Sequence, residues 1–298
     1  MGISDNRVVI VTGAASGIGR AHALEFARQG ANVVVNDIAP TDGVVKEIED
    51  LGGVAVSSRH DISEWDGAEE LVAATVAHFG DLHTVVNNAG ILRDGMLVTM
   101  DLEKWDAVVK VHLRGTFCVT HHAAAHWRER HKAGSPTPAP RVVNTTSPSG
   151  LFGNIGQSNY GAAKAGIAGF TVIVADELAR LGVGVNAIAP TALTDMTAGL
   201  DAYVSAVRDA SDKAGFDVGS PDNIAPLVVW LGSPDSEGIT GRVFTIKGAE
   251  LGVAETWVKG PTAVREDGRW EVEDVDRILP HLVAQARPNS TISGVPRA

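Results

Sequence analysis

The sequence predicts an α/β fold: a doubly wound parallel sheet of about seven strands with helices on both faces, in a single domain with a C-terminal extension. Two observations predict it. Short Val- and Ile-rich runs alternate with longer helical stretches along most of the chain. These runs are continuously apolar, as in parallel strands that are buried on both faces. The chain has 298 residues and is 44% hydrophobic, which is enough to bury a large core.

Strands and helices are expected in alternation along the chain. The expected strands are Val8–Val11, Asn32–Asn36, Val54–Ser57, Thr84–Asn87, Arg141–Asn144, Gly184–Ile188 and Arg242–Ile246. The expected helices are Ile18–Gln29, Thr41–Leu51, Trp65–Phe79, Leu102–Glu129, Gly161–Arg180 and Asn223–Leu231. Gly30 and Gly182 stand just behind two of these helices, where a left-handed residue often ends a helix.

We expect residues 1–256 to form the α/β domain and residues 257–298 to form a C-terminal extension. The extension is charged and contains prolines, so it could pack on the core or reach a neighbouring subunit. The Pro-rich segment Ala133–Pro140 cannot be helical. Because it is short and lies between an expected helix and an expected strand, we interpret it as a surface loop and not as a domain linker.

Composition and charge exclude several kinds of partner. The formal net charge is −11 and no basic run is present, so we expect no nucleic-acid partner. No apolar run approaches the length of a membrane span, and no signal peptide is visible at the N-terminus. We therefore expect a cytoplasmic protein with no membrane partner and no metal site. The single cysteine, Cys118, lies in an apolar stretch and is expected to be a buried thiol.

A glycine-rich motif, Thr12–Gly19, follows the first strand and opens the first helix. A dinucleotide pyrophosphate binds backbone N–H groups at a helix N-terminus, and glycines there permit a tight turn and close approach. The spacing is GxxxGxG, which differs from the general GxGxxG fingerprint. An ordinary glycine-rich turn is the alternative, but the strand before and the helix after disfavour it. The expected cofactor contacts in this motif are Gly13, Ser16, Gly17, Ile18 and Gly19.

Asp37 ends the second strand, 18 residues beyond Gly19. A carboxylate at this place can accept a hydrogen bond from the ribose 2′-OH of NAD, and it would repel the 2′-phosphate of NADP. We therefore expect NAD, with NADP disfavoured. Two alternatives stay open, because Asp is also common in turns and because Arg20 could neutralise a phosphate.

Two further segments follow expected strands and could contact the cofactor. Asp61 and Ile62 come after the third strand, where a carboxylate could accept a hydrogen bond from the adenine amino group. They could equally lead into the next helix. Asn88, Ala89 and Gly90 come after the fourth strand, where small residues would let the backbone pass beside a cofactor and asparagine side chains can satisfy neighbouring backbone groups.

Tyr160 and Lys164 are four residues apart, so they lie on one face of the expected helix. A free tyrosine ionises near pH 10, but an adjacent ammonium group favours the phenolate, which makes a usable general acid/base. Taken alone, such a pair is common on helix surfaces. Ser147 ends a strand upstream and could hydrogen-bond a substrate oxygen, although Ser149 competes for this role by proximity.

Together, in this order, these motifs resemble those of the short-chain dehydrogenase/reductase family over roughly residues 5–250. The resemblance implies a Rossmann fold and an enzyme that interconverts a secondary alcohol and a ketone with a nicotinamide cofactor. It also implies that Ser147, and not Ser149, is catalytic together with Tyr160. Lys164 would additionally bind the nicotinamide ribose.

Further expectations follow from the resemblance. Pro190 and Thr191 occupy the place where the family's backbone contacts the nicotinamide amide. His112 occupies the place of the family's usual catalytic Asn, which supports a proton-relaying water. Because histidine can donate and accept, a relay could survive, and a structural helix histidine is the alternative. The helices Leu102–Glu129 and Gly161–Arg180 would form the family's paired interface, which implies a homotetramer or homodimer.

Several segments, including His112–Gly115 and Ile224–Val228, look like the (3R)-hydroxyacyl-CoA dehydrogenase region of peroxisomal multifunctional enzyme type 2 and its bacterial relatives. This implies a (3R)-hydroxyacyl-CoA substrate, with a 17β-type hydroxysteroid as the alternative. A catalytically silent NAD-binding protein is an alternative of a different class, but such proteins usually lose the Tyr–Lys pair. The lid, Asp195–Gly219, would set the substrate, and its sequence carries no readable code.

Overall fold

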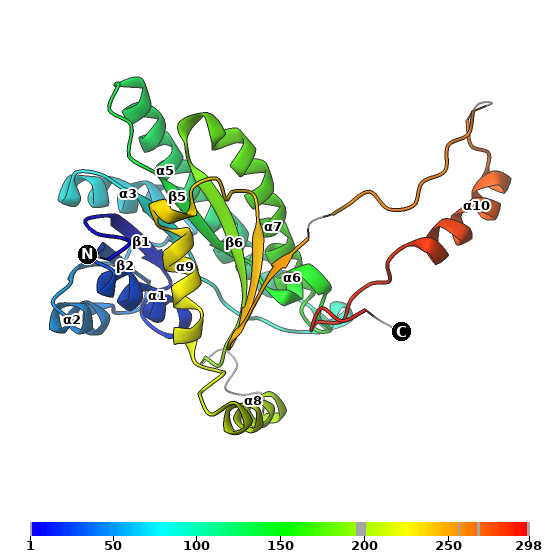
Figure 1. Ribbon diagram of the computed structural model, residues 1–298, viewed down its shortest axis with the longest axis horizontal. Helices are drawn as coiled ribbons and strands as arrows, with labels where there is room; N and C mark the ends of the chain where they lie inside the picture. Colours follow the sequence, from blue (N-terminus) through cyan, green and yellow to red (C-terminus); the bar gives the residue numbers. More distant parts are fainter. Residues whose placement is uncertain (1, 195–200, 256, 267–268, 297–298) are drawn as a thin grey trace.

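An eight-stranded sheet forms the centre of the molecule, in the order β3-β2-β1-β4-β5-β6-β7-β8 (Figure 1). The computed structural model describes residues 2–194, 201–255, 257–266 and 269–296. Strands β1 to β7 are parallel, and β8 pairs antiparallel with β7. The strands are β1 Val8–Thr12, β2 Asn32–Asn36, β3 Val54–Ser58, β4 Thr84–Asn87, β5 Arg141–Thr145, β6 Gly184–Thr191, β7 Val243–Lys247 and β8 Glu250–Ala254.

Helices cover both faces of this sheet, and each face has its own apolar core. The helices are α1 Gly17–Arg28, α2 Asp42–Asp50, α3 Trp65–Phe79, α4 Leu102–Val109, α5 Gly115–Lys132, α6 Pro148–Phe152, α7 Ser158–Leu178, α8 Asp201–Ala214, α9 Ala225–Leu231 and α10 Val272–Gln285. Val9 and Val11 of β1 pack with α1, α2 and α9, whereas Ile10 packs with α3, α5 and α7. Alternate side chains of a strand thus pack into opposite cores. This explains why the strand sequences are continuously apolar.

The doubly wound parallel sheet is confirmed, and the expected strands all form. The chain order reverses between β1 and β4, which is the switch point where ligands bind in such sheets, outside the carboxyl ends of the strands. The prediction of about seven strands missed β8. A two-residue turn that begins with Gly248, at φ 52°, folds β8 back onto β7. The run Glu250–Ala254 contains glycine and few β-branched residues, so its pattern did not predict a strand.

The single long helix expected at Leu102–Glu129 is instead two helices joined by a π-helical segment, Lys110–Arg114. The Gly115 N–H donates to the carbonyl of Lys110, five residues back. One residue is therefore inserted into the helical spacing, and such segments occur often at functional sites. Hydrophobic periodicity cannot reveal this insertion, because the helix continues on both sides. His112 lies in the middle of the segment.

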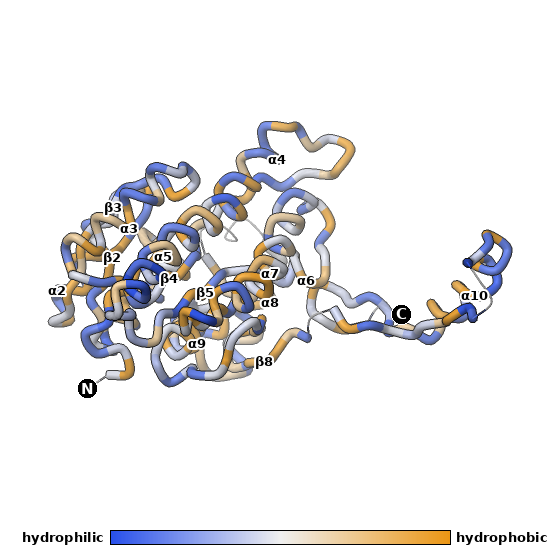
Figure 2. Tube along the Cα trace, turned by 90° about the horizontal axis from the view of Figure 1, so that it is seen from above, coloured by the Kyte–Doolittle hydropathy of each residue, from blue (hydrophilic) through white to orange (hydrophobic). Residues whose placement is uncertain are grey.

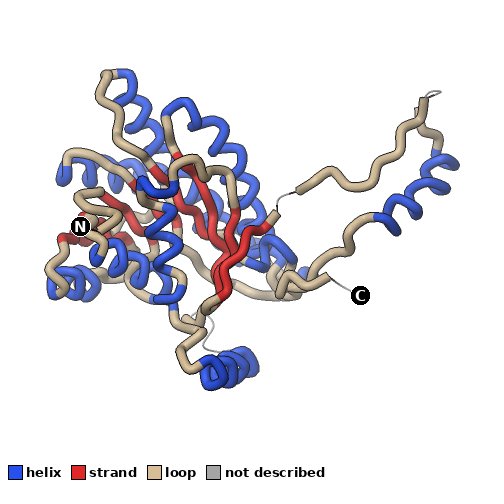
Figure 3. Tube along the Cα trace, viewed as in Figure 1, coloured by secondary structure: helices blue, strands red, loops and turns tan. Residues whose placement is uncertain are grey.

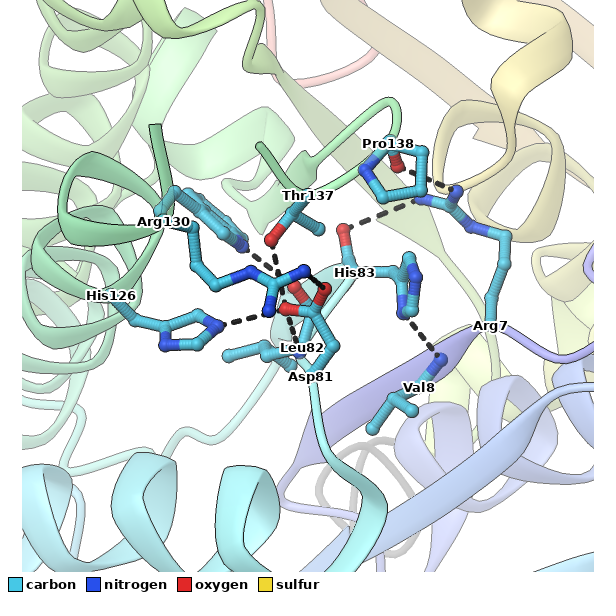
Figure 4. A network of polar contacts seen from close by, with 10 residues as sticks. Arg7, Val8, Asp81, Leu82, His83, His126, Arg130, Thr137 and Pro138 are labelled. Carbon is cyan, nitrogen blue, oxygen red and sulfur yellow. Dashed lines mark hydrogen bonds and ion pairs between the residues drawn. The ribbon is translucent and has the colours of Figure 1, made fainter. Parts of the chain in front are cut away.

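The amino-end edge of the sheet is closed by a polar network that holds the Pro-rich loop (Figure 4). Asp81 accepts a hydrogen bond from Thr137 at 2.8 Å, and its carboxylate lies 2.8 Å from His126 Nε2 and 3.1 Å from Arg130. The buried Arg7 donates to the carbonyl of Ala139 at 2.7 Å. The segment Ala133–Pro140 is therefore a loop, as predicted, fastened at the edge opposite to the switch point.

The C-terminal extension leaves the sheet after β8 and carries α10 away from the core (Figures 1 and 3). Hydrophobic residues stripe this helix (Figure 2). Val272, Leu279 and Val283 line one face and are exposed. Neither α10 nor the lid helix α8 was predicted, and residues 195–200 of the lid lie outside the described residues. Among the described helices, none is long and apolar enough to cross a bilayer.

Candidate active site

The glycine-rich motif forms a tight loop between β1 and α1. Gly13 and Gly17 have φ of 65° and 54°, which favour glycine. A Cβ at Gly13 would lie 2.6 Å from the Cα of Ala89, and a Cβ at Gly19 would lie 2.1 Å from the carbonyl oxygen of Gly13. The loop therefore has no room for side chains, and it brings bare backbone to the switch point beside the segment that follows β4.

The N-terminus of α1 is open to a ligand. Ser16 is the N-cap residue, is exposed, and makes no capping hydrogen bond with its side chain. The first N–H groups of a helix have no partner inside the helix, so those of Gly17, Ile18 and Gly19 are available to an anion at this end. Ile18 is partly buried against the core under α1. This loop thus fits the pyrophosphate of a dinucleotide.

Asp37 lies directly beside the glycine loop. Its carboxylate accepts hydrogen bonds from the N–H groups of Ala15, at 3.1 Å, and Ala39, at 3.0 Å. Arg20, which we considered as a phosphate ligand, forms an ion pair with Glu47 on α2 and so has a partner elsewhere. The side chain at the end of β2 is therefore acidic and held next to the loop, as a ribose ligand should be.

The segment Asp61–Ile62 lies between β3 and α3. Asp61 Oδ1 accepts hydrogen bonds from the backbone N–H and the hydroxyl of Ser63, at 2.9 and 2.7 Å. Ile62 is buried, and a Cβ at Gly115 would lie 2.2 Å from its Cδ1. Asp61 thus shapes the turn into α3, while its exposed position leaves the other carboxylate oxygen open to a ligand.

The segment after β4 is fastened to the glycine loop. Asn88 Nδ2 donates to the carbonyls of Thr12 and Gly13, at 3.1 and 3.2 Å. The backbone N–H groups of Asn88 and Ala89 both donate to Thr12 Oγ1. A Cβ at Gly90 would lie 2.2 Å from the ring of His112, so only glycine leaves space for that ring.

Tyr160, Lys164 and Ser147 meet at the carboxyl end of β5. The Lys164 ammonium lies 5.6 Å from the centre of the Tyr160 ring and donates to the carbonyl of Thr145 at 2.6 Å. The Ser147 hydroxyl interacts with the Tyr160 phenol closely enough to lower its pKa. The Ser149 hydroxyl donates instead to Gln157 at 2.7 Å. Of the two candidate serines, only Ser147 thus joins the Tyr–Lys pair directly.

Burial sets the ionisation of this group. Burial raises the pKa of the Tyr160 phenol, the Ser147 hydroxyl opposes this rise, and the charge of Asp94 adds to it. Burial lowers the pKa of Lys164 to about 7. Tyrosine and lysine both ordinarily lose their proton well above neutral pH. Here the two side chains lie together in a desolvated site, as general acid/base chemistry requires.

His112 packs edge-on against Tyr160, with ring centres 5.1 Å apart. Its Nε2 lies 2.8 Å from the carbonyl oxygen and 3.0 Å from the backbone nitrogen of Ile91. Its buried Nδ1 has no hydrogen-bond partner among the described residues. Burial, with the nearby charge of Lys164, lowers the pKa of His112 to about 3, so the ring is neutral.

Pro190 and Thr191 end β6 and are partly buried. The next turn approaches the glycine loop, because a Cβ at Gly17 would lie 3.3 Å from Thr194. The residues expected at the site therefore gather at one edge of the sheet. They come from the ends of β1, β2, β4, β5 and β6, from the turn after β3, and from α7 and the π-helical segment.

Comparison with known proteins agrees with this geometry. The family model described as short chain dehydrogenase matches residues 7–204. This chain belongs to the short-chain dehydrogenase family. A short-chain dehydrogenase from Mycobacterium avium, known from its crystal structure, is 44% identical, covers 100% of both chains and superposes with a TM-score of 0.88.

Two relatives of this short-chain dehydrogenase bear names that suggest a substrate. The hydroxyacyl-CoA dehydrogenase ChsB1 of Mycobacterium tuberculosis is 43% identical over 96% of this chain and 92% of its own length. The peroxisomal hydratase-dehydrogenase-epimerase of Neurospora crassa is 44% identical over 76% of this chain, and the match spans 23% of that longer protein. The predicted resemblance to the dehydrogenase region of peroxisomal multifunctional enzyme type 2 is thus confirmed.

Two polar side chains next to the Ser147–Tyr160–Lys164 group were not predicted from the sequence. Asn159 donates to the carbonyl of Arg93 at 2.9 Å and accepts from the Tyr160 N–H at 2.7 Å. Gln157 donates to Asp94 at 2.9 Å. Their closeness to Tyr160 in sequence was the available signal, but Asp94 and Arg93 lie more than 60 residues away from them and only the fold brings these residues together.

Proposed function

We propose that this enzyme oxidises the 3-hydroxyl group of a (3R)-hydroxyacyl-CoA with NAD, in a reversible reaction. The observation that carries the proposal is the Ser147–Tyr160–Lys164 group, with Ser147 and Lys164 buried, beside an open helix N-terminus at the switch point. The names of the mycobacterial and fungal relatives support the acyl-CoA substrate.

The side chains of this site would handle the hydroxyl proton. A bound nicotinamide cofactor would supply the hydride acceptor for this oxidation. Ser147 donates a hydrogen bond to the substrate oxygen and holds it toward Tyr160. The Tyr160 phenolate takes the hydroxyl proton as the C–H bond breaks. The Lys164 ammonium, close to the Tyr160 ring, favours the phenolate electrostatically and would bind the nicotinamide ribose.

The cofactor would lie across the switch point. The N–H groups at Ser16, Gly17, Ile18 and Gly19 would bind the pyrophosphate, with Gly13 allowing its approach. Further contacts would come from Asp61, Ile62, Asn88, Ala89, Gly90, Pro190 and Thr191. Asp37, whose carboxylate is held beside the loop, would accept from the ribose 2′-OH, which supports NAD over NADP.

His112 would relay protons between the catalytic group and water. Its neutral ring can accept at one nitrogen and donate at the other. Nε2 is close to Ile91, whereas Nδ1 has no partner among the described residues, so Nδ1 is the atom left for a water. The packing of the ring against Tyr160 supports a place in the relay.

We also propose that residues 1–256 form the catalytic domain and that the extension contacts a second subunit in a homodimer or homotetramer. The exposed apolar face of α10 supports this, since soluble monomers rarely expose such a patch.

The variant Tyr160→Phe tests the catalytic assignment. Removing the hydroxyl removes the proton acceptor but leaves the cofactor site, so turnover should fall at least about 1,000-fold while NAD still binds. NADH formation measures turnover, and calorimetry measures binding. Turnover within tenfold of the wild type would overturn the assignment of Tyr160.

A further inference from the structure

Two loops meet beside the catalytic side chains. The loop after β4 contains Asp94 and Gly95, and the loop between α6 and α7 contains Gly156 and Gln157. The Gly95 N–H donates to the carbonyl of Gly156 at 2.8 Å, and Gly95 and Gln157 form an isolated parallel β-bridge. Gln157 Nε2 donates to Asp94 Oδ2 at 2.9 Å. The Asp94 carboxylate thus holds the α6–α7 loop in place.

From Gln157 the hydrogen bonds continue to Ser147. The Ser149 hydroxyl donates to Gln157 Oε1 at 2.7 Å, and the Ser149 backbone N–H donates to Ser147 Oγ at 3.1 Å. Both serines are buried. The backbone carbonyl of Gln157 also accepts from the Gly161 N–H at 2.7 Å, in the first turn of α7 next to Tyr160.

The carboxylate gives this chain of hydrogen bonds a direction. A carboxylate can only accept, so the amide of Gln157 must turn its NH₂ group to Asp94 and its oxygen to Ser149. The Ser149 hydroxyl must then donate to that oxygen. Ser147 Oγ receives the Ser149 N–H, which leaves the Ser147 hydroxyl hydrogen free to point to a reacting oxygen.

We propose that Asp94 is a positioning residue for the dehydrogenation: through Gln157 and Ser149 it fixes the orientation of the Ser147 hydroxyl beside Tyr160. The inference rests on the proposed function, in which Ser147 holds the substrate oxygen. Asp94 itself touches neither Ser147 nor the reacting atoms in this scheme. Its effect reaches the Ser149 side chain through two side-chain hydrogen bonds, and the backbone N–H of the residue held in this way donates to Ser147 Oγ.

The charge of Asp94 has a second, measurable effect, on the pKa of Tyr160. The ionisable groups of the described chain that face Tyr160 are Lys164 on the same helix, His112 on the π-helical segment and Asp94 on the β4 loop. Lys164 favours the phenolate, and His112 is neutral above about pH 3. Asp94 is the anion of the three, and it raises the pKa of Tyr160. Because Asp94 is exposed, salt should weaken this effect.

The variants Asp94→Ala and Asp94→Asn separate the two effects. Asp94→Ala should lower kcat about tenfold with little change in the KM for NAD, because the hydrogen-bonded chain loses its anchor. Asp94→Asn keeps an acceptor, so it should lose less activity. Both should move the pH profile of oxidation to lower pH by a few tenths of a unit, and high salt should remove the shift. Asp50→Ala, an exposed acid on α2, is the matched control.

A double-mutant cycle tests the path through Ser149. If the chain of hydrogen bonds acts as one unit, Asp94→Ala combined with Ser149→Ala should lower kcat no more than the stronger single variant. Losses that multiply would overturn the proposed path. Kinetics of Asp94→Ala identical to those of the wild type, with an unmoved pH profile, would overturn the role of Asp94.

A measurement without turnover separates this inference from the proposed function. The chain has two tyrosines, so the variant Tyr203→Phe leaves Tyr160 as the single phenol whose ultraviolet absorbance titrates. In that background, Asp94→Asn should make Tyr160 ionise at lower pH, even if no acyl-CoA is a substrate. An unchanged titration at low salt would contradict the inference, whatever the substrate proves to be.

Discussion

His22 is a buried base away from Tyr160 and Lys164, and its protonation makes the stability of the fold depend on pH. His22 lies in α1 and its side chain is fully buried. Neither ring nitrogen has a hydrogen-bond partner among the described residues. Burial lowers its pKa to about 3. In the unfolded chain the ring would take up a proton near pH 6.5. Between these two values only the unfolded state binds the proton, so stability falls as pH drops from about 6.5 to 3.

The variant His22→Leu should therefore resist acid better than the wild type. Leucine is of similar size and cannot be protonated, so the gain in free energy of unfolding should be larger at pH 5 than at pH 7.5, by about 1–2 kcal/mol. Urea unfolding at the two pH values measures it. His131→Leu, at an exposed position near the end of α5, is the control. An equal gain at both pH values would show that His22 is not the buried neutral base described here.

At the same scale, the sequence predicted which residues gather at the site better than it predicted how they are held. The Tyr160–Lys164 pair and the glycine motif could be recognised from the sequence, because the residues of each lie close together in one local element. Asp94 did not stand out, because its proposed role depends on Gln157, which is 63 residues away in sequence. Long-range polar partners leave no periodic pattern for a single sequence to show.

At the scale of elements, continuous apolar runs predicted the buried strands, because these strands face a core on each side. The exposed elements were harder. The edge strand β8 exposes Leu251 and Val253, so it lacks the pattern of a buried strand. The π-helical segment around His112 differs from an α-helix by one residue of spacing. For β8 the missing signal is burial, whereas the π-helical segment, in which His112 is buried, was missed because hydrophobic periodicity does not show a one-residue insertion.

The extension that carries α10 should be separable from the core. Its apolar face is exposed and α10 stands away from the sheet, so a chain that ends at Glu255 should keep its fold and its NAD binding, with a melting temperature within a few degrees. If the extension contacts a second subunit, the shortened chain should also form a smaller particle in analytical ultracentrifugation. A shortened chain that does not fold would contradict the proposed boundary at residue 256.

At the scale of the whole molecule, the amino and carboxyl ends of the parallel strands have different roles. The amino-end edge is closed by Arg7, Asp81 and their partners, which fasten the Pro-rich loop (Figure 4). The carboxyl-end edge holds the glycine loop and the Tyr–Lys pair. Parallel strands bring all of their carboxyl ends to one side, so segments that are distant in sequence meet there. This topology is why one edge alone can combine cofactor binding with proton transfer.

The most direct test of the central claim is a spectrophotometric assay of NADH formation by the full-length protein. A (3R)-hydroxyacyl-CoA, its (3S) isomer and a 17β-hydroxysteroid are offered in parallel, each with NAD and with NADP. We expect the (3R) thioester to reduce NAD, and the other substrates and NADP to give far slower rates. Oxidation of the steroid with no reaction of the thioester would contradict the assigned substrate, and a preference for NADP would contradict the role of Asp37.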